Sequence, residues 1–213
     1  VPEDIRKEMF DRINTSSVPL VPMETRRGVF RGPFMNFIAE LAKDSKFKAL
    51  CPFTKYSENR HEEEELLLRF FAFVDTYPNF SHVEHKGVAK YLDEYLDNGN
   101  KYFTSENLAT KKMAFAQMVN FVSETYPGQG FAKKPNAKGV SKPYFEAISI
   151  GSYLALKENP NIHPHKLESL SVDKHNRNSF FETIEGRYHT HTASKILSRI
   201  NYVKEAYLSD AKK

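Results

Sequence analysis

The stretch EEEELLLRFFAFV, from Glu62 to Val74, carries the strongest structural signal in the chain. Its apolar residues cover almost the whole circumference of a helix, which predicts a helix buried at the centre of a domain. The four glutamates would form the first helical turn, where carboxylates complement the helix dipole. We therefore expect this acidic run to cap the helix and face solvent, and not to bind a metal.

Apolar residues recur at helical spacing on both sides of this stretch. We expect further helices over 3–14, 23–31, 34–41, 88–96, 105–126, 143–156 and 192–208, with one or two short ones inside 167–185. We expect the polar segment 51–60 to be irregular. No segment alternates with the period of a half-buried strand. The prediction is an all-α fold, an irregular multi-helix array of about seven or eight helices in a single domain over 1–213.

Composition excludes several classes of protein. The chain has 213 residues, 40% of them hydrophobic, which is ordinary for a globular domain. Its one cysteine, Cys51, excludes an internal disulfide framework and a cysteine-rich zinc site. We expect Cys51 to be a buried structural thiol and the protein to be cytoplasmic. No apolar run approaches the roughly 20 residues of a membrane-spanning helix, so we expect no membrane partner.

The positive charge is concentrated in the second part of the chain. The net charge is only +4, but residues 131–213 hold 14 Lys and Arg against 8 Asp and Glu. Four lysines lie in a loop rich in glycine and proline and at the start of the next helix: Lys133, Lys134, Lys138 and Lys142. We predict that these four lysines contact the phosphates of DNA, with an ordinary solvated surface as the alternative.

The histidines offer a second, weaker kind of site. His163 and His165, and His189 and His191, form two His-x-His pairs. A strand would place such a pair on one face, but neither pair lies in a predicted strand, so we assign no metal site. An HNH-like nuclease, with His165, Asn178 and His189 in that order, remains an alternative in which histidine activates water and a metal neutralises phosphate.

The amino-terminal segment contains a third group of candidates. Arg12 and Asn14 lie at the end of the first expected helix, beside a polar turn. Arginine can grip a phosphate with two hydrogen bonds, and asparagine can pair with the edge of a base. Physical grounds alone favour the structural alternative, in which Asn14 is a helix C-cap and Arg12 a surface ion-pair partner.

A family resemblance favours the role of Arg12 and Asn14 in binding a phosphate and a base. Phe10-Asp11-Arg12-Ile13-Asn14-Thr15, then Pro19-Leu20 and Glu24-Thr25-Arg26, resembles the segment that follows the catalytic core in the GmrSD-type restriction-endonuclease family. Later motifs resemble that family in the same order: Glu63–Ala72, Lys90–Leu96, Ser141–Ala147 and Ser198–Val203. Thr15-Ser16-Ser17 stands where the family often has Thr-Gly-Gly.

The resemblance implies nucleotide-dependent restriction of modified or foreign DNA, as an antiphage defence. The family's Asp-Gly-Gln-Gln-Arg signature, in an amino-terminal ParB/sulfiredoxin-like domain, is absent from this chain. We therefore expect the helical part of a longer protein, with 1–31 packed on a nucleotide-binding core outside the chain. Arg12, Asn14, Glu24 and Arg26 would line or brace the nucleotide pocket.

The implied cofactors belong to the parent protein, which would use an NTP and a divalent metal. We expect no cofactor in this fragment and no catalysis by the fragment alone, and the implied partners are DNA and the nucleotide-binding core. Two other functions remain open: a non-catalytic all-α protein-interaction domain, which would dock a partner on the face formed by Ile5, Met9 and Phe10, and the HNH-like nuclease.

Overall fold

The computed structural model describes residue 5, residues 8–9, residue 12, and residues 22–185 and 190–211. The helices are α2 (Pro22–Val29), α3 (Pro33–Leu41), α4 (Ser45–Leu50), α5 (Lys55–Asn59), α6 (Glu62–Thr76), α7 (Ser81–Tyr102), α8 (Ser105–Thr125), α9 (Lys142–Phe145), α10 (Gly151–Glu158), α11 (Ser179–Ile184) and α12 (Ala193–Asp210), with a π-helical turn η1 (Glu146–Ile150) and a 3₁₀ turn η2 (Glu168–Leu170). The described residues contain no strand, so the predicted all-α array is confirmed.

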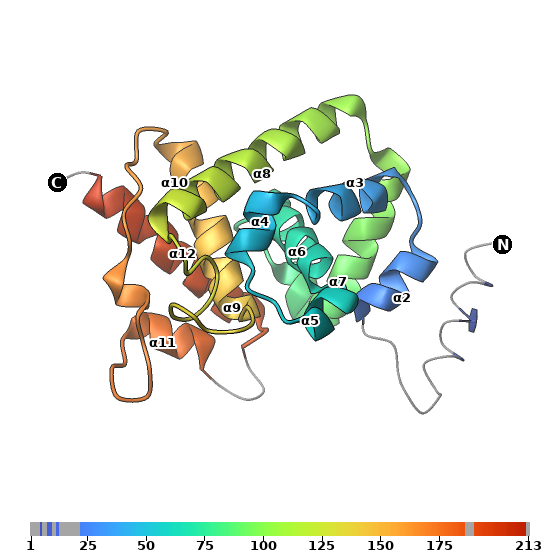
Figure 1. Cartoon of the computed structure of the whole chain (residues 1–213). Coiled ribbons are helices and arrows are strands. Elements are labelled where there is room, and N and C mark those ends of the chain that lie inside the picture. Colours follow the sequence, from blue (N-terminus) through green and yellow to red (C-terminus); the bar gives the residue numbers. More distant parts are fainter. Residues whose placement is uncertain (1–4, 6–7, 10–11, 13–21, 186–189, 212–213) are drawn as a thin grey trace.

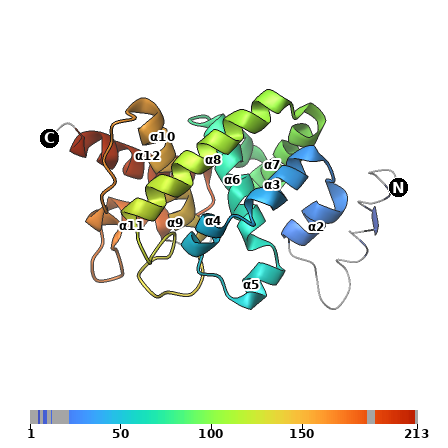
Figure 2. The same ribbon diagram turned by 45° about the horizontal axis from the view of Figure 1, so that its top comes forward.

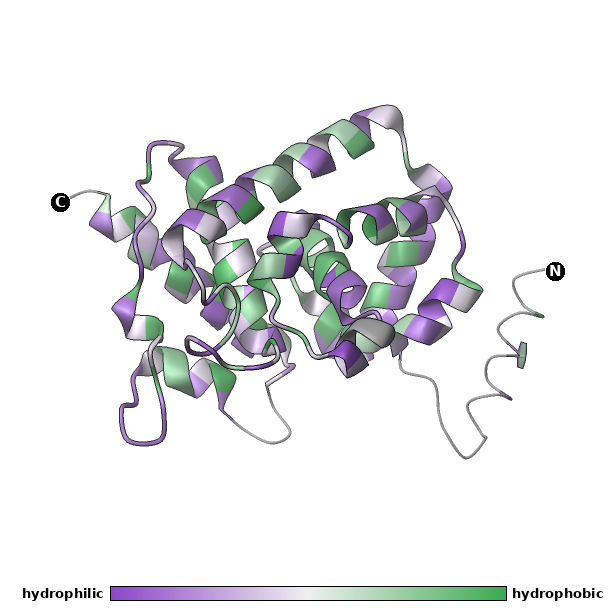
Figure 3. Cartoon of the chain, viewed as in Figure 1, coloured by the Kyte–Doolittle hydropathy of each residue, from purple (hydrophilic) through white to green (hydrophobic). Residues whose placement is uncertain are grey.

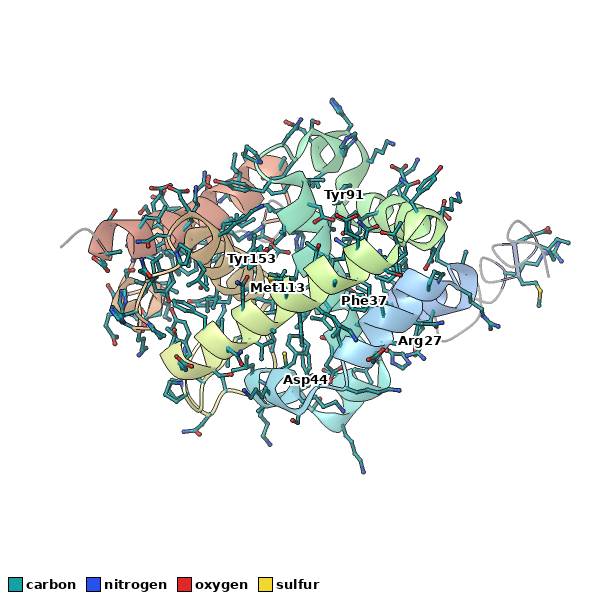
Figure 4. The ribbon with its side chains drawn as sticks, turned by 90° about the horizontal axis from the view of Figure 1, so that it is seen from above. Arg27, Phe37, Asp44, Tyr91, Met113 and Tyr153 are labelled. Atoms are coloured by element: carbon teal, nitrogen blue, oxygen red, sulfur yellow. The ribbon has the colours of Figure 1, made fainter. Side chains whose placement is uncertain are left out.

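The array is built around α6 (Figure 1). Every residue of α6 from Glu63 to Phe73 is buried, as the apolar belt predicts. The helices α3 and α7 pack on one side of α6. The turn η1 packs on another side of α6, and α12 packs against η1. The long helix α8 runs across the top of the molecule, with Phe37 and Asp44 on one side of it and Tyr91 and Tyr153 on the other (Figure 4).

The apolar residues gather on the inward faces of these helices, and the loops are largely hydrophilic (Figure 3). Phe34, Phe37, Phe71 and Phe103 form one aromatic cluster between α3, α6 and the end of α7, with ring centroids 5.1–6.4 Å apart. Such contacts contribute about 0.5–1.5 kcal/mol each beyond the burial of their area. Aromatic residues of α3 and of the end of α7 thus help to hold α6 in place.

The expectation that the acidic run faces solvent was wrong. Glu63, Glu64 and Glu65 are only 5–7% exposed. Glu64 accepts from Arg27 at 2.5 Å, and Glu65 accepts from Arg69 and Lys142. Since a buried carboxylate needs a positive partner, Glu64 and Glu65 are held by basic residues of α2, of α6 itself and of α9.

Two other expectations changed at the level of single helices. The segment 51–60 is not wholly irregular, because it contains α5, and α4 before it was not anticipated. Both helices have six residues or fewer, so neither carries a full hydrophobic period. The side chain of Asp44 starts α4 by accepting from the N–H of Phe47 at 2.9 Å. The expected first helix, 3–14, lies mostly outside the described residues.

The helix that runs from α9 into α10 approaches α12 closely. A Cβ atom on Gly151 would lie 2.7 Å from the Cβ of Val203 and 2.8 Å from the carbonyl oxygen of Ile200. Only glycine therefore allows this crossing without a shift of one helix. The contact fixes the position of η1, and with it Glu146, relative to α12.

We predict that Gly151→Ala destabilises the fold by about 1–3 kcal/mol, because the added methyl group overpacks the α10–α12 contact. Urea unfolding followed by circular dichroism measures this change. Lys157→Ala, at an exposed position of α10, is the control and should change stability by less than about 0.5 kcal/mol. Equal stability of Gly151→Ala and the unsubstituted chain would contradict this packing.

Candidate nucleic-acid interface

The lysine-rich loop between α8 and α9 is attached to the end of α4. The N–H of Phe131 donates to the carbonyl of Leu50 at 2.9 Å, and the N–H of Gly139 donates to the carbonyl of Pro52 at 2.7 Å. The loop lies beside α4 in two views of the molecule (Figures 1 and 2). These two backbone hydrogen bonds bring segments about 80 residues apart in sequence onto one surface.

Gly130 makes this attachment possible. It has a φ of +55°, and a Cβ atom there would lie 2.3 Å from the carbonyl oxygen of Leu50. The left-handed backbone and the close approach both exclude a side chain. Phe131, the next residue, is fully buried and packs on Phe145 with ring centroids 4.7 Å apart. The loop is thus anchored by its backbone and by one aromatic side chain.

The attachment gathers exposed lysines from separate segments. We call them the basic surface; its members are Lys48, Lys55, Lys133, Lys134 and Lys138. The loop sequence 128–142 contains no acidic residue. Between 43 and 55 the only acid is Asp44, which caps α4. The positive charge of this surface therefore has little neutralisation from its own segments.

The basic surface includes three of the four lysines predicted to bind nucleic acid. Lys133, Lys134 and Lys138 are exposed, and the ammonium of Lys133 lies 5.6 Å from the ring centroid of Tyr144. Lys142 differs, because its ammonium is 2.8 Å from Oε1 of Glu65. It joins the basic surface to the buried charges behind it.

Those buried charges form a chain of ion pairs across the core. Oε1 of Glu65 lies 3.0 Å from Nη2 of Arg69, and Nη1 of Arg69 donates to Oε1 of Glu146 at 2.8 Å. Oε2 of Glu146 lies 3.1 Å from Nε of Arg199. The chain connects α6, η1 and α12, and Glu146 and Arg199 are both completely buried.

Arg199 is also held by backbone. Its guanidinium donates to the carbonyl of Thr183 at 3.2 Å and to the carbonyl of Thr190. Burial lowers the pKa of Arg199, and the carboxylate of Glu146 opposes that effect. A buried guanidinium with these partners links α12 to the end of α11 and to the segment before α12.

The effect of these ion pairs on the pKa of a carboxyl is clearest at Glu65. Burial alone would raise the pKa of its carboxyl, but the positive charges of Arg69 and Lys142 outweigh burial and lower the pKa to about 2. Glu64 shows the opposite balance, because burial raises its pKa more than Arg27 lowers it. Glu65 is therefore the firmly ionised member of the acidic run.

Two of the predicted nucleotide-binding residues, Glu24 and Arg26, lie on α2. Arg26 is 3% exposed; its Nε donates to Asp93 at 2.7 Å and its Nη2 to the carbonyl of Ala89 at 3.0 Å. This geometry suits a bracing role between α2 and α7. Glu24 lies two residues earlier on α2, and residues two apart on a helix do not face each other.

Of the other two members of that set, only Arg12 is among the described residues. Arg12 is exposed and forms an ion pair with Glu8 at 2.6 Å, which was the alternative considered for it. Asn14 lies outside the described residues. The face expected to dock a partner is described only in part: Ile5 and Met9 are exposed, at 46% and 54%, and Phe10 lies outside the described residues.

An open cavity of about 510 Å³ lies where α2 meets α3, with Arg27, Arg31, Gly32 and Asn36 in its lining. Arg27 is engaged by Glu64, whereas Arg31 is exposed and pairs with no other described residue. This cavity was not predicted from the sequence, because Arg27 and Arg31 belong to no recognisable motif. It is a basic cavity beside α2, which carries two of the predicted nucleotide-binding residues.

The histidines and the cysteine have structural surroundings. Nε2 of His165 lies 3.2 Å from Asp210, and Asn178 caps α11 by accepting from Phe181 at 3.1 Å; His189 lies outside the described residues. The hairpin that an HNH-like site requires is absent from the described part of the chain. No group of three or more potential metal ligands occurs among the described side chains.

Cys51 is buried, as expected, and is a free thiol. Burial raises its pKa well above the usual value, and the nearby Glu63 raises it further. A thiol of this kind stays protonated at neutral pH and is a poor nucleophile.

Comparison of the chain with family models, with curated proteins and with solved structures gives no match. None of the described helices has the length and hydrophobicity that crossing a membrane requires. The chemistry of the site therefore rests on its own geometry and on the sequence motifs.

We predict that Glu65→Gln lowers the free energy of unfolding at pH 7 by about 3 kcal/mol, because it leaves Arg69 and Lys142 without their shared carboxylate. In the folded chain the pKa of Glu65 is about 2, below the usual value of 4.5. The unfolded state therefore binds more protons as the pH falls, and this stabilisation is complete above about pH 4.5 and is lost towards pH 2.

Denaturant unfolding of both proteins between pH 2 and pH 7 tests this prediction. The difference in stability should shrink progressively below about pH 4.5. Glu158→Gln is the matched control, since it removes an exposed ion pair with Lys204 and should cost less than about 1 kcal/mol. A Glu65→Gln difference that stays constant over this pH range would show that the carboxylate charge is not what stabilises the core.

Proposed function

We propose that this chain is the helical, DNA-contacting part of a nucleotide-dependent restriction protein that acts on modified or foreign DNA in the cytoplasm. One structural observation supports the DNA contact: two backbone hydrogen bonds attach the loop that bears Lys133, Lys134 and Lys138 to the segment that bears Lys48 and Lys55. The ordered resemblance of the sequence to the GmrSD-type family supports the wider role.

The charges of the basic surface fit a phosphate backbone. Lysine ammonium groups contribute sequence-independent contacts that release counterions from DNA. Phosphate contacts fix the register and orientation of a protein on DNA but carry no sequence information. The proposed role of this surface is therefore to hold DNA, while the chemistry and the recognition of a DNA modification would belong to the nucleotide-binding core.

The nucleotide side of the proposal rests on α2. The segment 1–31 would pack on the core, with Arg12 and Asn14 near the nucleotide and Glu24 and Arg26 bracing them. Arg26 supports a bracing role because Asp93 and the carbonyl of Ala89 fix its guanidinium. In this proposal the nucleotide-binding core of the parent protein would bind the NTP and the divalent metal.

We predict that the triple substitution Lys133→Ala, Lys134→Ala and Lys138→Ala weakens DNA binding and its dependence on salt. Each lost phosphate contact should reduce the slope of log K against log [salt] by about 0.9 for duplex DNA. Fluorescence anisotropy with a labelled duplex, at several salt concentrations, measures both effects.

The matched control removes three exposed lysines from other surfaces: Lys90, Lys157 and Lys174. This control lowers the net charge of the chain by the same amount as the test variant. It should leave most of the affinity and the salt slope in place. If both triple variants lose affinity equally, DNA responds to total charge and the basic surface has no special role. Absence of DNA binding by the unsubstituted chain would refute the proposed DNA contact.

A further inference from the structure

An exposed aromatic side chain follows one lysine of the basic surface in the sequence. Tyr56 is 65% exposed and follows Lys55 directly in α5. Pro52, four residues earlier, accepts the hydrogen bond that attaches the loop at Gly139, next to Lys138. Tyr56 is therefore adjacent in sequence to Lys55 and belongs to the segment to which the lysine-rich loop is attached.

The ring of Tyr56 is held in place from one side. The guanidinium of Arg60, one helical turn further on, lies 5.0 Å from the ring centroid and donates to the tyrosine hydroxyl. A cation over one face of an aromatic ring is attracted to the ring and restrains its orientation. Burial does not explain Tyr56, since it is among the few large hydrophobic side chains that are exposed.

We propose that Tyr56 is a stacking residue for an unpaired base, so that the basic surface binds single-stranded DNA, or a single-stranded portion of its DNA substrate, in preference to an intact duplex. In a duplex the faces of the bases are covered by their neighbours, and only an unpaired base offers a free face to an aromatic ring. Lysines that follow the phosphates, with an aromatic ring between them, are the arrangement that single-strand binding requires.

This inference rests on the proposed function, since it needs the lysines to contact DNA. It goes further by naming the form of DNA and the side chain that selects it. The lysines supply affinity for either form, and Tyr56 supplies the difference between them. Substitution of Tyr56 should therefore change the preference and not only the affinity.

The test uses the whole chain and two probes of equal length, a mixed-sequence single strand that carries 2-aminopurine and the corresponding blunt duplex. Tyr56→Ala should weaken single-strand binding about tenfold and duplex binding less than about twofold. Tyr56→Phe should retain the preference, because it keeps the ring. Quenching of 2-aminopurine fluorescence on binding should be strong with the unsubstituted chain and with Tyr56→Phe, and lost with Tyr56→Ala.

Tyr102→Ala is the matched control. Tyr102 is 72% exposed at the end of α7, where α7 leads into α8, away from the lysine-rich loop (Figure 1). This variant should bind both probes as the unsubstituted chain does. Thermal unfolding followed by circular dichroism confirms that each variant is folded.

The outcomes separate the two proposals. If the lysine variant loses DNA binding and Tyr56→Ala binds the single strand normally, the stacking role is refuted and the DNA contact survives. If Tyr56→Ala weakens both probes equally, Tyr56 does not select the single strand, and the inference is also refuted. If neither probe binds the unsubstituted chain, both proposals fail together.

Discussion

The structure depends on the carboxylate of Glu65 at the start of α6. It accepts from Arg69 one turn later, and lies 2.8 Å from the ammonium of Lys142 at the start of α9. Through Arg69 and Glu146 the same set of charges reaches Arg199 in α12. Glu65 thus ties the lysine-bearing segment to the central helix, and Glu146 ties the central helix to the final one.

This network has a cost as well as a benefit. Removing charged groups from water is unfavourable, and well-packed apolar residues often give equal or greater stability. Ion pairs in this position instead restrict how the helices can be arranged, because each charge must meet its partner. In this chain the ion pairs fix η1 and α9 against α6. The loop before α9 is therefore held between α9 and the end of α4.

The sequence predicted the parts of the fold that rest on long hydrophobic periods. The buried helix α6, the long helix α8 and the terminal helix α12 all carry such a period. The acidic run shows the limit of this reasoning. A run of glutamates at a helix start satisfies the helix dipole equally well in water or in a buried network, and only the positions of Arg27, Arg69 and Lys142 distinguish the two. Those residues lie on other turns and other helices, so the sequence alone does not bring them together.

The same limit applies to the candidate interface. The loop lysines were predicted from their density in the sequence, but Lys48, Lys55 and Tyr56 join them only through the hydrogen bonds at Leu50 and Pro52. Gly130 was the one available signal, since a glycine between two buried segments indicates a close approach of the backbone. Helices of five or six residues, such as α4 and α5, are too short for periodicity to reveal.

Amide hydrogen exchange of the chain, with and without single-stranded DNA, examines the interface as a whole. If the attached loop and the α4–α5 segment form one DNA-binding surface, DNA should slow exchange in 48–56 and 131–142 together, and leave the α7–α8 junction unchanged. Protection confined to another part of the chain, or protection of only one of the two segments, would show that the hydrogen bonds at Leu50 and Pro52 do not build a common binding surface.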